Sequence, residues 1–134
     1  MDDVRCRLPT VLCIDDYSLG LATTISILRA NSYRVLAVAD VERVIDLFVE
    51  NPVDAVILDC HLLQGRTRQV VEALRTLRPS IPIIMMSACC SLPCAELRNA
   101  DFCIQKGKTG RSLLRVLETA IVASRYGLCR SLAA

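Results

Sequence analysis

Three carboxylates stand at points of this sequence where short apolar runs end. Asp15 and Asp16 follow the apolar run 11–14, and Asp59 follows the apolar run 55–58. Both runs are rich in β-branched residues and too short for helices, so we interpret them as strands. In an open parallel sheet, ligands bind in the crevice beyond the carboxyl ends of the strands. The three acids are therefore candidates for one shared site.

Two later apolar runs also lead to polar residues, Ser87 after 82–86 and Lys106 after 101–104. Carboxylates held close together repel one another, and Mg²⁺ is a cation that relieves this repulsion through oxygen ligands. A carboxylate also attacks phosphorus to form an acyl phosphate, whose oxygens an ammonium and a hydroxyl group can neutralise. We therefore predict Asp59 as a phosphoacceptor. The predicted Mg²⁺ ligands are Asp15, Asp16, Asp59 and the backbone carbonyl of His61.

Five strands must position these residues, and we expect them at about 10–14, 33–39, 55–58, 82–86 and 101–104. The first helix is opened by Ser18 or Asp16 and ends at Asn31, and the second begins after Asp40 and ends at Asn51. Further helices are expected at about 67–77, 92–99 and 109–125. Because parallel neighbours need crossover connections, this alternation predicts an α/β doubly wound domain with five flanking helices.

The bulk composition sets limits on partners and location. A chain of 134 residues that is 53% hydrophobic has the size of one ordinary domain. Its net charge of +2 gives no reason to expect direct binding to nucleic acid. The sequence has no apolar run long enough to span a membrane and begins with acidic residues, unlike a secretory signal. We therefore expect a cytoplasmic protein without a membrane partner.

The eight cysteines are interpreted mainly as free thiols, because no export signal accompanies them. A zinc site formed by Cys89, Cys90 and Cys94 with His61 is the alternative. Their spacing contains no CxxC pair and Pro93 interrupts it, which favours the reading without metal.

A group of arginines belongs to the helix predicted at 67–77 and its two ends. The simplest interpretation is a solvated helix face, and a docking patch for a partner is the alternative. The residues are Arg66, Arg68, Arg75 and Arg78.

In order, spacing and strand context, a set of short motifs resembles the receiver domain of two-component response regulators over about residues 9–125. These motifs are Ile14-Asp15-Asp16, Leu58-Asp59, Met86-Ser87-Ala88 and Lys106. The resemblance implies a flavodoxin-like fold with strand order 2-1-3-4-5. It also implies a single receiver domain over residues 1–134, with no output domain.

The resemblance further implies that Asp59 receives a phosphoryl group from a sensor histidine kinase or a phosphotransfer protein in a Mg²⁺-dependent step. Ser87 and Lys106 would contact the phosphoryl oxygens. Such a domain is no enzyme beyond its own phosphorylation and dephosphorylation, and it signals through contacts with a downstream protein. A homodimer would use the face formed by residues 92–99, 101–104 and 109–125.

Two positions depart from the family pattern and keep other functions open. Gly107 stands where receivers carry a proline after the lysine, and Cys103 replaces the switch aromatic three residues before it. A receiver-like scaffold that no longer accepts phosphate is therefore one alternative. A Mg²⁺-dependent aspartyl phosphohydrolase is another, although such enzymes need an acid where this chain has His61. The His61 side chain is interpreted as exposed, or as a group that orients a hydrolytic water.

Overall fold

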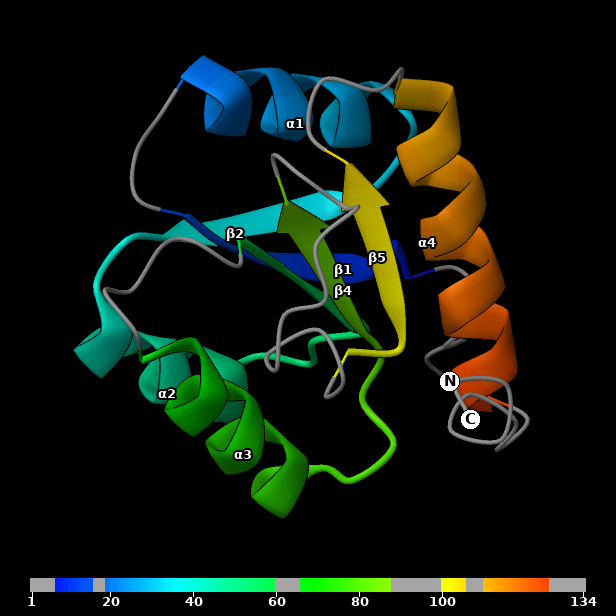
Figure 1. Ribbon diagram of the computed structural model, residues 1–134. Helices are drawn as coiled ribbons and strands as arrows, with labels where there is room; N and C mark the ends of the chain where they lie inside the picture. Colours follow the sequence, from blue (N-terminus) through cyan, green and yellow to red (C-terminus); the bar gives the residue numbers. More distant parts are fainter. Residues whose placement is uncertain (1–6, 16–18, 60–65, 88–99, 106–109, 126–134) are drawn as a thin grey trace.

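The computed structural model describes residues 7–15, 19–59, 66–87, 100–105 and 110–125 (Figure 1). Its five strands form one parallel sheet in the order β2-β1-β3-β4-β5. The strands are β1 (Thr10–Ile14), β2 (Arg34–Val38), β3 (Ala55–Asp59), β4 (Ile83–Ser87) and β5 (Phe102–Gln105). The helices are α1 (Leu19–Ala30), α2 (Val41–Glu50), α3 (Thr67–Leu77) and α4 (Gly110–Arg125).

This topology confirms the predicted doubly wound α/β fold and its strand order. The described residues contain four of the five expected helices, and the helix predicted at 92–99 lies outside them. Strands β3, β4 and β5 each end one residue later than predicted, so that Asp59 is the last residue of β3 and Ser87 is the last residue of β4. Both polar residues therefore belong to the sheet ladder itself.

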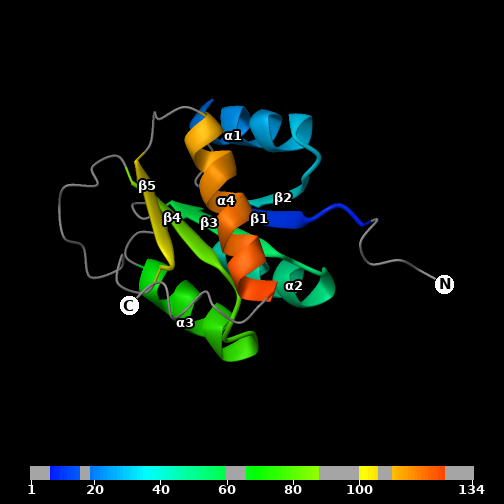
Figure 2. The same cartoon turned by 90° about the vertical axis from the view of Figure 1, so that its right-hand side faces the viewer.

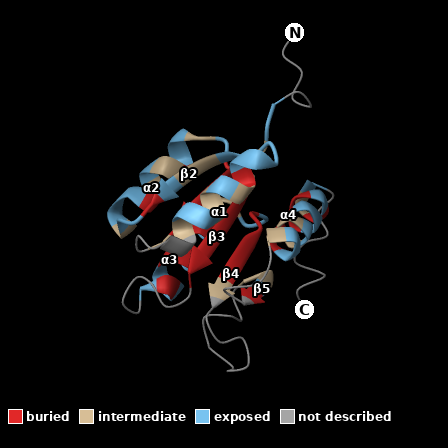
Figure 3. Ribbon diagram, turned by 90° about the horizontal axis from the view of Figure 1, so that it is seen from above, coloured by how far each residue is buried: buried red, intermediate tan, exposed pale blue. Residues whose placement is uncertain are grey.

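The helices form one layer on each face of the sheet, with α1 and α4 on one face and α2 and α3 on the other (Figures 1 and 2). Successive residues of a strand point to opposite faces. In β1, Leu12 and Ile14 accordingly pack in the cluster that contains α2 and α3 residues. Val11 and Cys13 pack in the cluster that contains α1 and α4 residues. The buried residues follow the strands, whereas exposed residues lie on the outer sides of the helices (Figure 3).

Two helix ends show how local sequence sets the boundaries of these layers. Asp40 caps α2 by accepting a hydrogen bond from the Glu42 N–H at 3.1 Å, as predicted. After α1, the Tyr33 N–H donates to the Leu28 carbonyl at 3.1 Å, and the Ser32 N–H donates to the Arg29 carbonyl at 3.3 Å. This pair of bonds is a Schellman motif, and it places Ser32 in the left-handed region with φ of 68°.

The arginine group at α3 is only partly the solvated face that the sequence predicted. Arg66 and Arg68 are exposed and pair with carboxylates at the surface. Arg75 instead forms a buried ion pair with Asp101, with 2.8 Å between Nη2 and Oδ2. Arg78 lies over the Phe48 ring, 5.0 Å from its centre, and donates to the backbone carbonyl of residue 53. The solvated interpretation is therefore wrong for Arg75 and Arg78.

The Arg75 ion pair fastens α3 to the amino ends of two strands. The same Oδ2 of Asp101 that pairs with Arg75 also accepts a hydrogen bond from the Ile83 N–H at 2.8 Å. Arg75 Nη1 donates to the Ile81 carbonyl, again at 2.8 Å. Since Ile83 begins β4 and Asp101 directly precedes β5, the Asp101 side chain ties both strands to the helix.

Within the described residues, no helix has the length and apolar character needed to cross a membrane.

Candidate functional site

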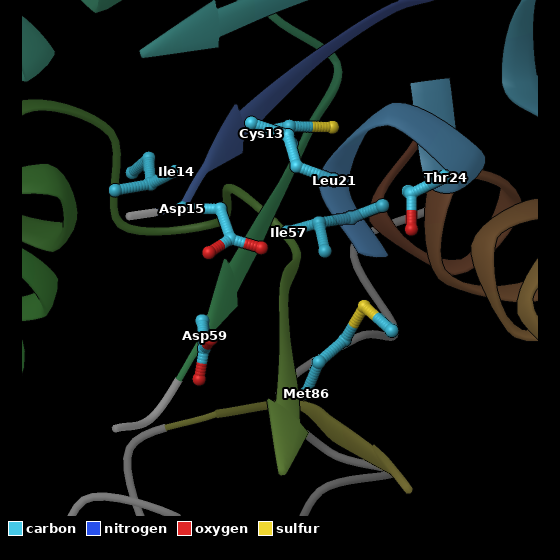
Figure 4. A pocket seen from close by; sticks show the side chains of 8 residues that line it. All are labelled: Cys13, Ile14, Asp15, Leu21, Thr24, Ile57, Asp59 and Met86. Carbon is cyan, nitrogen blue, oxygen red and sulfur yellow. The ribbon is translucent and has the colours of Figure 1, made fainter. Parts of the chain in front are cut away.

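The structure brings Asp15 and Asp59 together at the carboxyl edge of the sheet. Ile14 of β1 pairs with Leu58 of β3 in the parallel ladder, and each acid is the next residue along its strand. Neighbouring strands lie about 4.8 Å apart, so the two carboxylates leave the sheet at the same level of adjacent strands. Figure 4 shows the Asp15 side chain extending from β1 toward Asp59. The convergence of these two acids, predicted from the strand ends, is confirmed.

Both acids line one pocket between the strand ends and α1. Its walls consist of strand residues and two α1 side chains: Cys13, Ile14, Asp15, Leu21, Thr24, Ile57, Asp59 and Met86 (Figure 4). Asp59 is 6% exposed, whereas Asp15 is half-buried. Asp59 is thus the more deeply recessed of the two acids.

The pocket is an unfavourable place for further negative charge. Burial, and to a smaller extent the neighbouring Asp15 carboxylate, together raise the pKa of the Cys13 thiol to about 12. Cys13 therefore stays a neutral thiol at physiological pH and behaves as a small apolar wall residue. The negative charge of the pocket comes from its acids.

The other predicted site residues are placed only in part. Ser87 is paired with Gln105 in the ladder and follows Met86, the cross-strand partner of Asp59. Ser87 thus ends the strand next to β3, at the same sheet edge. Asp16, His61 and Lys106 lie outside the described residues. The three cysteines of the alternative zinc site, at positions 89, 90 and 94, lie outside them as well.

The donor atoms of the pocket suit a hard cation. Asp15 and Asp59 offer carboxylate oxygens, which are the ligands that Mg²⁺ prefers. Across the residues that the structure describes, no group of three histidine, cysteine, aspartate or glutamate side chains is arranged to hold a metal ion. Asp15 and Asp59 are two of the predicted Mg²⁺ ligands, and the predicted third acid, Asp16, directly follows Asp15 in the sequence.

Sequence reasoning missed the α1 residues of the pocket. Thr24 lies three residues after Leu21 and four before the buried Leu28, so all three occupy one side of the helix. Figure 4 shows the Thr24 hydroxyl at the wall of the pocket. The available signal was a threonine on the same side of α1 as Leu21 and Leu28, because a position on that side normally carries an apolar residue.

In β5, Cys103 occupies the position of the family's switch aromatic, and it is more exposed than its neighbours. Cys103 is an exposed residue, whereas its neighbour Phe102 is half-buried and packs against the cluster beneath α4. The aromatic side chain of this strand therefore belongs to the core rather than to the outer face. In the sequence, Phe102 lies one position before Cys103, the residue that stands in place of the family's switch aromatic.

Comparison with known proteins gives a consistent picture. The family model for the response regulator receiver domain matches residues 11–118. A CheY-like receiver domain protein from Methanospirillum hungatei superposes with a TM-score of 0.78 at 22% identity, covering 90% of this chain and 98% of that one. The receiver domain of an HD domain-containing protein from Pseudomonas fluorescens gives 0.80 at 20% identity, covering 95% and 96%.

A third similar structure is the receiver domain of a sensor histidine kinase from Pseudomonas aeruginosa, with magnesium coordinated in its active-site cleft. It has a TM-score of 0.74 at 22% identity and covers 85% of this chain and 98% of that one. No curated protein matches the sequence significantly. The family match spans β1 through most of α4 and includes both acids of the pocket. The chain belongs to the response regulator receiver domain family.

Proposed function

We propose that this receiver domain accepts a phosphoryl group on Asp59 from the phosphohistidine of a sensor histidine kinase or of a phosphotransfer protein. The observation that carries this proposal is that Asp15 and Asp59 directly follow the paired residues Ile14 and Leu58 and line a common pocket. Phosphorylation would then alter contacts with a downstream protein. A homodimer formed through residues 92–99, β5 and α4 is a second contact that phosphorylation would alter.

The transfer forms one bond and breaks another at phosphorus. A carboxylate oxygen of Asp59 bonds to phosphorus while the bond from phosphorus to the donor imidazole nitrogen breaks, and its electron pair leaves with that nitrogen. The product is an acyl phosphate. In this proposal the Ser87 hydroxyl and the Lys106 ammonium contact the phosphoryl oxygens and offset their negative charge.

The proposed metal ligands are Asp15, Asp16, Asp59 and the backbone carbonyl of His61. Bound Mg²⁺ supplies positive charge beside the transferring phosphoryl group. Two carboxylates at one level of adjacent strands support this assignment, because a cation lowers the cost of holding both in the ionised form. The magnesium in the cleft of the Pseudomonas aeruginosa receiver domain also supports it.

Intact mass spectrometry after incubation with acetyl phosphate and Mg²⁺ tests the proposal. We expect the wild-type chain to gain the mass of a single phosphoryl group, and Asp59→Asn to gain none. Asp46→Asn is the matched control, since Asp46 is an exposed acid on α2 and its loss leaves the pocket intact. An adduct that persists in Asp59→Asn, or one that forms equally well without Mg²⁺, contradicts the proposal.

A receiver-like scaffold that takes no phosphate is the second candidate function. The observation that favours it is the exposed Cys103 in β5, which leaves the outer face of this strand without the family's aromatic side chain. The same experiment separates the candidates. Absence of an adduct at every Mg²⁺ concentration supports the scaffold, whereas continuous release of inorganic phosphate with many turnovers supports an aspartyl phosphohydrolase.

A further inference from the structure

The first residue of α4 touches α1 so closely that a side chain there would overlap with it. A Cβ atom placed on Gly110 would lie 2.9 Å from Cδ1 of Ile27, 3.1 Å from its Cγ2 and 3.3 Å from its Cγ1. Ordinary contacts of this kind begin at 3.4 Å. The glycine therefore lets the two helices approach each other within a normal carbon contact (Figures 1 and 2).

Backbone conformation offers no other reason for this glycine. Gly110 has no left-handed φ, and glycine within a helix is less favourable than alanine. A residue with a side chain would thus suit the local backbone at least as well. The close approach to Ile27 is the feature of the structure that a larger residue would disturb.

The same helix α1 also forms one wall of the acidic pocket. Ile27 follows Thr24 by three residues, so the two side chains neighbour each other along the helix surface. Thr24 and Leu21 line the same pocket as Asp15 and Asp59 (Figure 4). The other pocket walls belong to strands whose spacing is fixed by the hydrogen-bonded ladder, whereas α1 is held by side-chain packing. The packing of α1 against α4 is therefore one of the contacts that place this wall of the pocket.

We propose that Gly110 is a positioning residue for phosphorylation of Asp59: its lack of a side chain seats α1 at the distance from the strand ends that the transfer requires. The inference rests on the proposed phosphoacceptor function. A methyl group at position 110 requires the Ile27 side chain to shift, and we expect part of that shift to reach Thr24, which lies one turn away on the same helix. A shift of about 1 Å at a remote position can cost about 100-fold in rate, and a smaller displacement should cost correspondingly less.

The test uses Gly110→Ala together with the double variant Gly110→Ala/Ile27→Val. Replacing isoleucine by valine deletes Cδ1, the atom nearest to the added methyl group. We expect Gly110→Ala to slow phosphoryl incorporation from acetyl phosphate by roughly three- to tenfold, and the double variant to recover to within about twofold of wild type. Ser112→Ala adds an alanine at an exposed position in the same turn and serves as the control. Urea unfolding of each variant separates slow chemistry from lost stability.

Two results overturn the inference: a wild-type rate in Gly110→Ala, or a slow rate that Ile27→Val does not restore. A wild-type chain that incorporates no phosphate contradicts the proposed function instead. In that case amide ¹H and ¹⁵N chemical shifts of the unphosphorylated variants decide about Gly110. Shifts at Thr24 and Asp59 in Gly110→Ala that return to wild-type values in the double variant support positioning, and unchanged shifts refute it.

Discussion

Loss of the Asp101 carboxylate is the perturbation to which we expect this fold to respond most strongly. The Asp101 side chain is 2% exposed and that of Arg75 is 16% exposed, with 2.8 Å between the paired atoms. The carboxylate also accepts the hydrogen bond from the Ile83 N–H that starts β4. In Asp101→Ala the guanidinium group stays largely buried without its anion, and a backbone donor loses its partner.

Removing one partner of a buried ion pair costs about 3–5 kcal/mol, because the remaining charge is left desolvated. A buried backbone N–H group that loses its acceptor costs about 1–3 kcal/mol. The two penalties overlap here because the same Asp101 oxygen accepts from both Arg75 and the Ile83 N–H. We therefore expect Asp101→Ala to lower the free energy of unfolding by about 4 kcal/mol, out of a typical total of about 5–15 kcal/mol. Asp101→Asn keeps an acceptor for Ile83 and should lose less.

Urea unfolding followed by far-ultraviolet circular dichroism measures this loss, since the chain contains no tryptophan. The matched control is Glu72→Ala, which removes an Arg68 partner at 3.2 Å on the same helix, where both side chains are more than 60% exposed. This exposed pair should contribute less than about 0.5 kcal/mol. If Asp101→Ala costs no more than Glu72→Ala, burial does not control the strength of these pairs and the reasoning is refuted.

Three further changes test local features of the fold. Ser32→Gly should raise the free energy of unfolding by about 1 kcal/mol, because glycine adopts the left-handed φ of 68° without strain; a thermal melt at or below that of wild type contradicts this. Asp40→Ala should lower the free energy of unfolding by about 1 kcal/mol, because α2 loses its N-terminal cap. An unchanged urea midpoint would contradict a stabilising role of this cap. Burial raises the pKa of the Cys13 thiol from 9.0 to about 12. The unfolded chain therefore releases this proton first, and stability should fall from about pH 9 upward. Urea titrations should show a steeper fall in wild type than in Cys13→Ala, and equal slopes would exclude the thiol as the cause.

Much of the fold could be predicted because the sheet is built from short continuous apolar runs. Strand β1 and helix α3 have the predicted bounds, and the strand order implied by the family resemblance is confirmed. The meeting of Asp15 and Asp59 could be predicted for the same reason, since a residue that ends a parallel strand must lie at the carboxyl edge. The chemical roles of all the predicted site residues stay predictions: Asp15, Asp16, Asp59, His61, Ser87 and Lys106.

Features that depend on tertiary distances could not be predicted from residue types. Arg75 and Arg68 have the same chemistry and lie on the same helix, yet one is buried because Asp101 approaches it from a distant segment. The contact between Gly110 and Ile27 likewise joins two helices far apart in the sequence. A helix pattern indicates which side of a helix is apolar, but it does not indicate how near the next helix lies.

The fastening of β4 and β5 at their amino ends has a practical consequence. Arg75 and Asp101 hold both strands to α3 at the edge remote from the acidic pocket. The ladder with β3 fixes β4 as far as Met86, and β5 is paired with β4 as far as Gln105. The ion pair and the acid that we expect to carry the phosphoryl group therefore lie at opposite ends of the same strands, so a change at one can be made without touching the other.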